Sequence, residues 1–181
     1  MTNNLLTGTN LRLRALEPED IDFLFDMEND TSIWQVSNTN APFSRFQLEQ
    51  YVLNAPNDIY TNRQLRLMID FIDPANKKQT VGAIDLFDFD PLHKRAGIGI
   101  LIIKPFREKE IAQQAMEILI RYAFTNLGLH QLFCNISMDN EPSVRLFEKL
   151  GFKRCSVKKE WLRDGANWKD EWMFQLLCHE D

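Results

Sequence analysis

Four consecutive charged residues, Arg107, Glu108, Lys109 and Glu110, stand between a hydrophobic segment and an amphipathic one. Phosphates often bind at the start of a helix, because the first backbone amides are unpaired there and the helix dipole is positive. Arg107 and Lys109 could contact a phosphate, or they could be ordinary exposed charges. The glutamates stand where a phosphate site would normally have glycine, and acids in a first helical turn commonly only stabilise the dipole. Both interpretations stay open.

Three aspartates in the stretch IDLFDFD, Asp85, Asp88 and Asp90, form a second group of candidates. Side chains alternate between the two faces of a strand, so Asp85 and Asp88 lie on opposite faces. One of these carboxylates could accept a proton from an amine as a general base. The alternative is that each of them faces solvent.

Metal chemistry is not expected from the sequence. Cys134, Cys155 and Cys178 are widely spaced, and the three histidines also lie far apart. Zinc sites need closely spaced Cys and His ligands. We therefore predict buried, reduced thiols and no metal site.

Composition limits the partners and the location. The formal net charge of −5 gives no general attraction to nucleic acid or to anionic membranes. The first ten residues lack the basic start and apolar run of a signal peptide, and no apolar stretch approaches the ~18 residues of a membrane span. We expect a cytoplasmic protein. Its 181 residues predict a single domain over 1–181.

Hydrophobic periodicity predicts the elements that position these residues. Residues 11–16 alternate as a half-buried strand does, and a helix follows. Ser44 and Gln47 form a capping-box pattern that predicts a second helix. Three strands joined by short polar turns come next and predict an antiparallel meander. They cover residues 65–72, 79–89 and 95–103.

The second half begins with the helix after the charged run, whose apolar stripe includes Ala115, Met116 and Leu119. A strand over 132–137, a helix in DNEPSVRLFEKLGF and a hairpin around Gly165 complete the chain. This order predicts a mixed α/β fold, in which a mostly antiparallel sheet is flanked by about four helices.

The stretch from His93 to Phe152, and above all its last segment NEPSVRLFEKLGF, resembles the GNAT superfamily of acyl-CoA N-acyltransferases. The segment fits the family pattern N-x-x-(S/A)-x-x-x-(Y/F)-x-K-x-G-F. Within the superfamily, the ribosomal-protein and spermidine N-acetyltransferases are the most similar branches. The resemblance extends over nearly the whole chain and implies a GNAT fold, with a central sheet that is splayed in the middle.

The resemblance also implies where acetyl-CoA binds. The splayed strand of the family pairs with the pantetheine arm, and its residues here are Ile100, Leu101 and Ile102. The next loop wraps the pyrophosphate with backbone amides, and Glu110 stands at the central glycine of its motif. This loop comprises Arg107, Glu108, Lys109, Glu110, Ile111, Ala112 and Gln113. Asn140 either orients the cofactor near the thioester, with Ser143 one turn further on, or is only a helix cap.

Two positions depart from the residues that the family uses for proton transfer. Many relatives have a tyrosine at the position of Phe147, which protonates the departing CoA thiolate, but phenylalanine has no proton to give. Some relatives carry a glutamate base where this chain has Asn135. General acids and bases contribute typically ~10²–10⁴-fold. A bound thioester and a positioned amine still gain from proximity without them.

The acceptor side is less well defined by the resemblance. Trp34, Phe43 and Phe46 lie in the region that forms the acceptor wall in the family, or they belong to the core. Polyamine-binding relatives use acidic residues in this region, whereas the segment SNTNAPF offers Ser, Thr and Asn. Specificity for polyamines is therefore not indicated.

We predict that the chain transfers an acetyl group from acetyl-CoA to a primary amine of a small molecule or a protein N-terminus by direct attack. Asp85, Asp88 and Phe147 are the candidate catalytic positions. The alternative function is a non-catalytic acyl-CoA sensor or a protein-interaction module, which the residues at Glu110 and Phe147 favour. A homodimer is also an option, because family members often pair.

Overall fold

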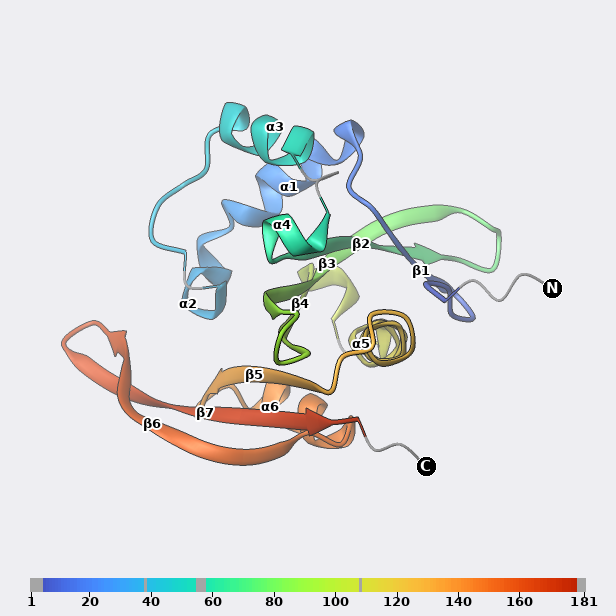
Figure 1. The fold of residues 1–181 in the computed structure, drawn as a ribbon. Coiled ribbons are helices and arrows are strands. Elements are labelled where there is room, and N and C mark those ends of the chain that lie inside the picture. The colour runs from blue at the N-terminus through green and yellow to red at the C-terminus, as the bar shows by residue number, and fades with distance from the viewer. Residues whose placement is uncertain (1–4, 38, 55–57, 108, 179–181) are drawn as a thin grey trace.

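Seven strands form one sheet in the computed structural model, which describes residues 5–37, 39–54, 58–107 and 109–178. Their order across the sheet is β1-β2-β3-β4-β5-β7-β6 (Figure 1). Neighbouring strands are antiparallel except β4 and β5, which run parallel. The predicted mixed, mostly antiparallel sheet is therefore confirmed. The strands are β1 (Leu11–Arg14), β2 (Leu65–Ile72), β3 (Lys78–Asp90), β4 (Arg95–Ile102), β5 (Gln131–Ser137), β6 (Lys153–Asp164) and β7 (Asn167–Leu177).

Four α-helices of at least eight residues flank the sheet in the described part of the chain, as predicted: α1 (Ile21–Glu28), α3 (Arg45–Asn54), α5 (Ile111–Thr125) and α6 (Glu141–Lys149). Two short α-helices are not predicted from the sequence pattern, α2 (Trp34–Ser37) and α4 (Ile59–Asn62). Each has only four residues, too few for a hydrophobic period to be recognised. Short 3-10 helices cover Pro18–Asp20, Thr31–Ile33 and Lys104–Phe106.

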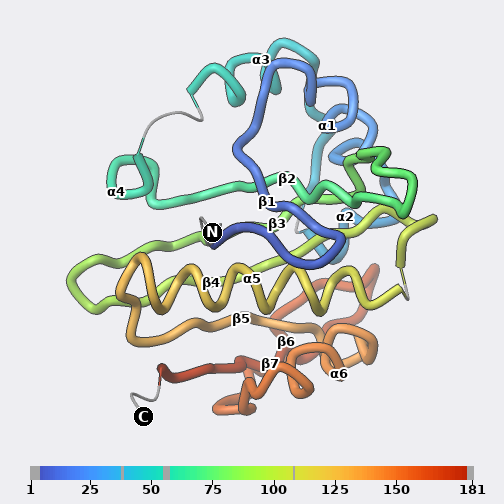
Figure 2. The backbone as a smooth tube through the Cα atoms, turned by 90° about the vertical axis from the view of Figure 1, so that its right-hand side faces the viewer, coloured from blue at the N-terminus to red at the C-terminus, as the bar shows by residue number. Residues whose placement is uncertain are grey.

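Helices cover both faces of the sheet. α1 and α3 lie over one face, in a cluster that includes Leu24 and Met68. α5 and α6 lie over the other, where Met116 and Phe147 belong to the larger core. Figure 2 shows α5 running along the sheet, in front of β4 and β5. None of the helices among the described residues is long and apolar enough to cross a membrane.

Two helix boundaries that bear on the site follow from local sequence signals. The Ser44 N–H donates to Gln47 Oε1 at 2.8 Å and the Gln47 N–H donates to Ser44 Oγ at 3.2 Å, which confirms the capping box before α3. After α6, the Phe152 N–H donates to the Phe147 carbonyl at 3.1 Å, and Gly151 has a φ of 89°. This ending fixes the last turn of the helix that carries Phe147.

The sheet divides between its two parallel strands. Pairing of β4 with β5 ends at Gly97 and Phe133, although β4 continues to Ile102 and β5 to Ser137. On its other side β4 stays paired with β3 as far as Ile102. The predicted splay is therefore confirmed, and it leaves one edge of β4 facing a gap.

Candidate active site

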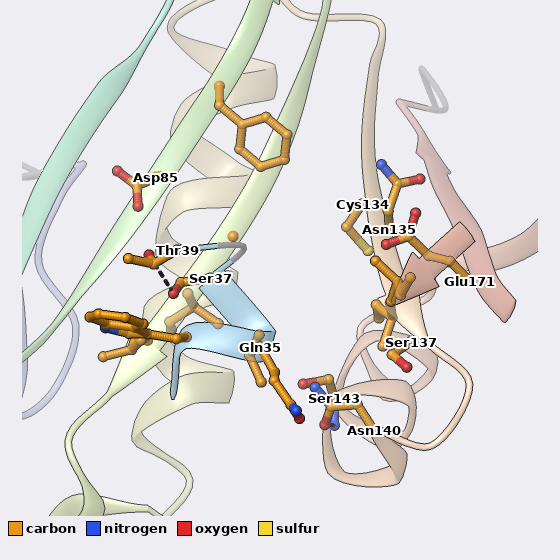
Figure 3. Close-up of a pocket in the computed structure, with 18 of the residues that line it drawn as sticks. Gln35, Ser37, Thr39, Asp85, Cys134, Asn135, Ser137, Asn140, Ser143 and Glu171 are labelled. Atoms are coloured by element: carbon orange, nitrogen blue, oxygen red, sulfur yellow. Dashed lines mark hydrogen bonds between the residues drawn. The ribbon is translucent and has the colours of Figure 1, made fainter. Parts of the chain in front are cut away.

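The diverging ends of β4 and β5 open into a cavity of about 900 Å³. Gly99, Ile100 and Leu101 of β4 line one side, and residues 134–137 of β5 line the other. The cavity continues between α2 and the β6–β7 hairpin. Figure 3 shows how side chains from these distant parts of the sequence surround one space.

The beginning of α6 closes one end of the cavity with Asn140, Ser143 and Phe147. Asn140 Oδ1 accepts a hydrogen bond from the Ser143 N–H at 3.3 Å, so Asn140 caps the helix. Phe147 is 5% exposed and packs edge-on against Phe152, with ring centroids 5.0 Å apart. This end of the cavity thus combines a polar cap with an aromatic ring that carries no hydroxyl.

Arg66 holds two carboxylates together at another wall of the cavity. Its Nε donates to Asp85 Oδ1 at 2.7 Å and its Nη2 to Asp85 Oδ2 at 3.1 Å. Its Nη1 donates to Glu28 Oε1 at 2.5 Å, and the guanidinium lies 5.6 Å from the centroid of the Tyr51 ring. Burial lowers the pKa of Arg66, but the interactions with Asp85 outweigh burial and leave the pKa raised. We call Glu28, Arg66 and Asp85 the arginine triad.

The two aspartates proposed as bases occupy different environments. Asp85 lines the cavity, but Arg66 engages both of its oxygens, so it is poorly placed to accept a proton. Asp88 is exposed and does not line the cavity. It has a φ of 48°, at the point where pairing of β3 with β4 becomes irregular, and this bulge directs the residue away from the regular alternation of the strand. The structure therefore brings only Asp85 to the cavity.

Glu171 of β7 is a cavity residue that the sequence pattern does not single out. It is 6% exposed, and its Oε2 accepts a hydrogen bond from Lys158 Nζ at 3.1 Å. In the sequence it lies in the charged stretch WKDEW, which is typical of a solvated hairpin. Its burial depends on the pairing of β5, β6 and β7, so no local signal could have revealed it.

Cys134 also lines the cavity, where burial makes its thiol a poor nucleophile. Burial, with smaller contributions from Cys155 and Glu171, raises the pKa of the Cys134 thiol far above its ordinary value. The thiol is 3% exposed and stays neutral. Within the described residues, no cluster of three or more His, Cys, Asp or Glu side chains could hold a metal ion.

Every carboxylate that lines the cavity within the described ranges is ion-paired. Glu28 and Asp85 share Arg66, and Glu171 pairs with Lys158. At the hairpin end, Lys169 Nζ lies 2.5 Å from Asp139 Oδ2 and 2.8 Å from Asp164 Oδ2. The five carboxylates of the lining are Glu28, Asp85, Asp139, Asp164 and Glu171.

The described side chains of the loop between β4 and α5 do not line this cavity. Arg107 turns back, so that its Nε donates to the Ile102 carbonyl at 2.9 Å, and it lines a second cavity of about 220 Å³ beside α1. Lys109 Nζ lies 4.7 Å from the centroid of the Phe106 ring. Glu108 lies outside the described residues. The two cations proposed for phosphate binding thus have contacts within the protein.

Glu110 is the N-cap of α5 and lies in the left-handed region, with a φ of 58°. Its side chain makes no capping hydrogen bond, and the helix begins at Ile111, so Glu110 precedes the first turn instead of belonging to it. Glycine adopts this conformation without steric cost, whereas a residue with a Cβ does not. The backbone of Glu110 therefore has a conformation that favours glycine.

The cavity therefore brings together part of the predicted site: Asp85, Ile100, Leu101, Asn140, Ser143 and Phe147. Ile102 is 7% exposed and does not line the cavity, and Ile111 is buried in the core. Ala112 and Gln113 follow it in the first turn of α5, away from the lining. Of the three aromatic residues expected in the acceptor wall, only Trp34 lines the cavity, whereas Phe43 and Phe46 are exposed elsewhere.

Comparison with known proteins places the chain in a family. The family model of the acetyltransferase (GNAT) domain matches residues 10–153. The SPbeta prophage-derived uncharacterized N-acetyltransferase YokL of Bacillus subtilis (strain 168) is 30% identical over 161 residues, which cover 88% of this chain and 86% of YokL. Spermidine N(1)-acetyltransferase of Vibrio cholerae is 26% identical over 145 residues, which cover 80% of each chain.

Solved structures show the same fold. The crystal structure of spermidine N-acetyltransferase from Vibrio cholerae in complex with CoA and spermine has a TM-score of 0.84. It is 24% identical, and the match covers 94% of this chain and 96% of that one. A probable acetyltransferase matches with a TM-score of 0.81 at 22% identity, over 94% of each chain.

The chain belongs to the GNAT acetyltransferase family. The class predicted from the sequence, an acyl-CoA-dependent N-acetyltransferase that acts on an amine, is confirmed at this level. The relatives reported above carry the names of enzymes, so they do not support the alternative of a non-catalytic sensor or interaction module.

Proposed function

We propose that the chain transfers the acetyl group of acetyl-CoA to the primary amine of a small molecule or a protein N-terminus inside the cavity of about 900 Å³. The observation that carries this proposal is the edge of β4 that β5 leaves unpaired after Gly97. Extended chains add to an open strand edge through backbone hydrogen bonds. The pantetheine arm is extended and contains two amides, so it fits along residues 99–101.

The remaining roles follow from this placement. Asn140 and Ser143 at the start of α6 contact the donor near its thioester, and Phe147 packs beside the thiol. A backbone amide of β4, near Ile102, stabilises the oxyanion that forms when the amine attacks the acetyl carbonyl. The amides at the start of α5 hold the pyrophosphate. No covalent enzyme intermediate is required.

The charges of the cavity favour an acceptor with a single amino group. Each carboxylate of the lining already has a cation of the protein as its partner. A polyamine would have to displace these partners or stay uncompensated, which costs binding energy. We therefore propose a monoamine or a protein N-terminus in place of the spermidine that names the Vibrio cholerae relative.

Two measurements test the function. Calorimetric titration with CoA asks whether the donor binds. Release of free CoA thiol from acetyl-CoA is then followed with phenethylamine, a tripeptide amide with a free N-terminus, and spermidine. We expect CoA binding and turnover of at least one of the first two amines above the rate with spermidine. Absence of CoA binding at millimolar concentration, or binding without turnover of any amine, would reject the proposal.

Replacing Glu110 with glycine is expected to tighten CoA binding about five- to tenfold, because it removes a negative charge and a Cβ beside the pyrophosphate. The free energy of unfolding should rise by about 0.5–1 kcal/mol, since glycine relieves the left-handed φ at a modest entropic cost. Calorimetric titration at low and high salt measures the first effect, and chemical denaturation measures the second.

Glu110→Gln is the matched control for this substitution. Glutamine removes the charge but keeps the Cβ and the left-handed backbone conformation. It should therefore give the salt-dependent part of the gain in affinity without the gain in stability. A folded Glu110→Gly protein that binds CoA no tighter than the wild type would show that this loop does not hold the pyrophosphate.

Replacing Phe147 with tyrosine is expected to raise kcat about tenfold, because the new hydroxyl can protonate the CoA thiolate at the cavity wall. Thiol release with the best amine of the panel measures this change. Phe152→Tyr is the control, since Phe152 packs against Phe147 but does not line the cavity. A Phe147→Tyr protein with unchanged donor affinity and a lower rate would mean that water or another group already protonates the thiolate in the wild type.

Location and assembly belong to the same proposal. We propose a cytoplasmic enzyme that forms one domain over 1–181 and associates as a homodimer. The three free cysteines support a reducing compartment. The Vibrio cholerae relative has been seen as a dodecamer, which supports self-association in this family. Sedimentation of the purified chain measures the assembly directly.

A further inference from the structure

Ser137, Glu171 and Lys158 lie in one row across β5, β7 and β6. Paired residues of antiparallel strands have their side chains on the same face, and all three of these residues line the cavity. Asn135 is two residues from Ser137 on β5, so it shares that face. Figure 3 shows the side chains of Asn135 and Glu171 beside the same space.

Glu171 keeps one oxygen available in this row. Its Oε2 accepts from Lys158 Nζ at 3.1 Å, whereas Oε1 has no hydrogen bond to any residue in the described part of the chain. The side chain is 7% exposed, compared with 12% for Glu28 and 18% for Asp85. An ionised carboxylate with free lone pairs can accept a proton. Because Glu171 is buried and lines the cavity, a proton donor can reach it only from the cavity.

We propose that Glu171 is the general base of acetyl transfer, taking one proton from the acceptor ammonium directly or across one water molecule. β7 would thus supply the carboxylate that this chain lacks at Asn135 of β5. This inference rests on the proposed function, because it requires an amine acceptor in the cavity.

The acceptor ammonium gives one proton to Oε1, which converts the carboxylate of Glu171 into a carboxylic acid and leaves a neutral amine. The nitrogen lone pair forms a bond to the acetyl carbon, and the carbon–sulfur bond breaks. The thiolate takes the second proton from the nitrogen, and Glu171 returns its proton to solvent.

The charged groups around Glu171 distinguish it from the other carboxylates of the cavity. Lys158 contacts it from β6, and Lys169 lies two residues away on β7 but is shared by Asp139 and Asp164. From β5, Ser137 lies opposite Glu171, and the charge of Glu171 contributes to the raised pKa of the Cys134 thiol. In another wall of the cavity, Glu28 and Asp85 are both paired with Arg66. Glu171 therefore combines burial, a cation of its own and a free oxygen.

The test compares kcat/KM for the best amine of the panel from pH 7 to pH 10 in the wild type, Glu171→Gln and Glu148→Gln. We expect a flat wild-type profile, because the base converts bound ammonium to amine. With phenethylamine, Glu171→Gln should lose about 10²-fold near pH 7 and recover about tenfold per pH unit until the pH reaches the pKa of the amine, since only free amine then reacts. Glu148, an exposed residue paired with Arg154 outside the cavity, serves as the control and should keep the wild-type profile.

A structural role for Glu171 would give a different result. A deficit of equal size at every pH, or a wild-type rate in Glu171→Gln, would overturn the assignment while leaving the proposed function intact. A wild type without turnover would remove both. If Glu171→Gln fails to fold or loses CoA affinity, Glu171→Asp decides: a shortened base should lower the rate and keep the flat profile, and a rising profile would contradict the proposal.

Discussion

Replacing Arg66 with methionine is expected to lower the free energy of unfolding by about 2–4 kcal/mol, because it leaves Glu28 and Asp85 without their shared cation. The two carboxylates then repel each other at a site where their side chains are only 12% and 18% exposed. Urea denaturation measures the change.

Arg45→Met is the matched control for this effect. Arg45 also pairs with a carboxylate, that of Asp22, and lies 5.3 Å from the centroid of the Phe25 ring. Both members of this pair are largely exposed, so its loss should cost far less stability than the loss of Arg66. Combining Arg66→Met with Asp85→Asn should restore part of the lost stability. Equal losses in Arg45→Met and Arg66→Met would contradict the argument from burial.

Replacing Gly82 with alanine is expected to lower the free energy of unfolding by about 3 kcal/mol and to weaken CoA binding. A Cβ at Gly82 of β3 would lie 2.1 Å from the Leu101 carbonyl oxygen and 3.1 Å from the Ile102 Cα. Both of these atoms belong to the backbone, so β4 must shift, and Leu101 of β4 lines the cavity. Thermal denaturation and calorimetric titration with CoA measure the two effects.

Gly99→Ala tests whether Gly82→Ala loses stability through the close contact or through the replacement of any glycine in these strands. Gly99 lies on β4, and its Cβ would meet only the Phe87 ring, at 3.6 Å, which is ordinary contact distance. Its φ is not in the left-handed region. We therefore expect stability within about 0.5 kcal/mol of the wild type. A stable Gly82→Ala protein would mean that β3 and β4 separate more easily than their pairing indicates.

Most of the fold was predictable because its signals are local. The strand Leu65–Ile72 has the predicted bounds, since a run of apolar residues ends in turn residues on both sides. The α6 boundaries follow from Asn140 as N-cap and Gly151 as the left-handed ending. The start of α5 was harder to predict, because the charged run before it is compatible both with a first turn and with the preceding loop.

Apart from Asp85, the predicted residues that reach the cavity come from the family resemblance. Asn140, Ser143 and Phe147 reach the cavity because the motif fixes the register of one helix. Arg66 and Glu171 escaped notice, because their importance arises from neighbours that are distant in the sequence. Asp88 was a candidate because regular alternation was assumed, and a bulge in β3 breaks that alternation. Pairing and bulges are decided by the sheet as a whole, and a single segment does not encode them.

The splay between β4 and β5 also divides the sheet into two mechanical halves. Only residues 95–97 of β4 pair with β5, so β1 to β4 on one side and β5 to β7 on the other are joined through a short seam and the shared core. A donor bound in the gap as proposed would replace the missing length of strand between the halves. Hydrogen exchange of the backbone amides in the centre of the sheet would then slow as the donor concentration rises.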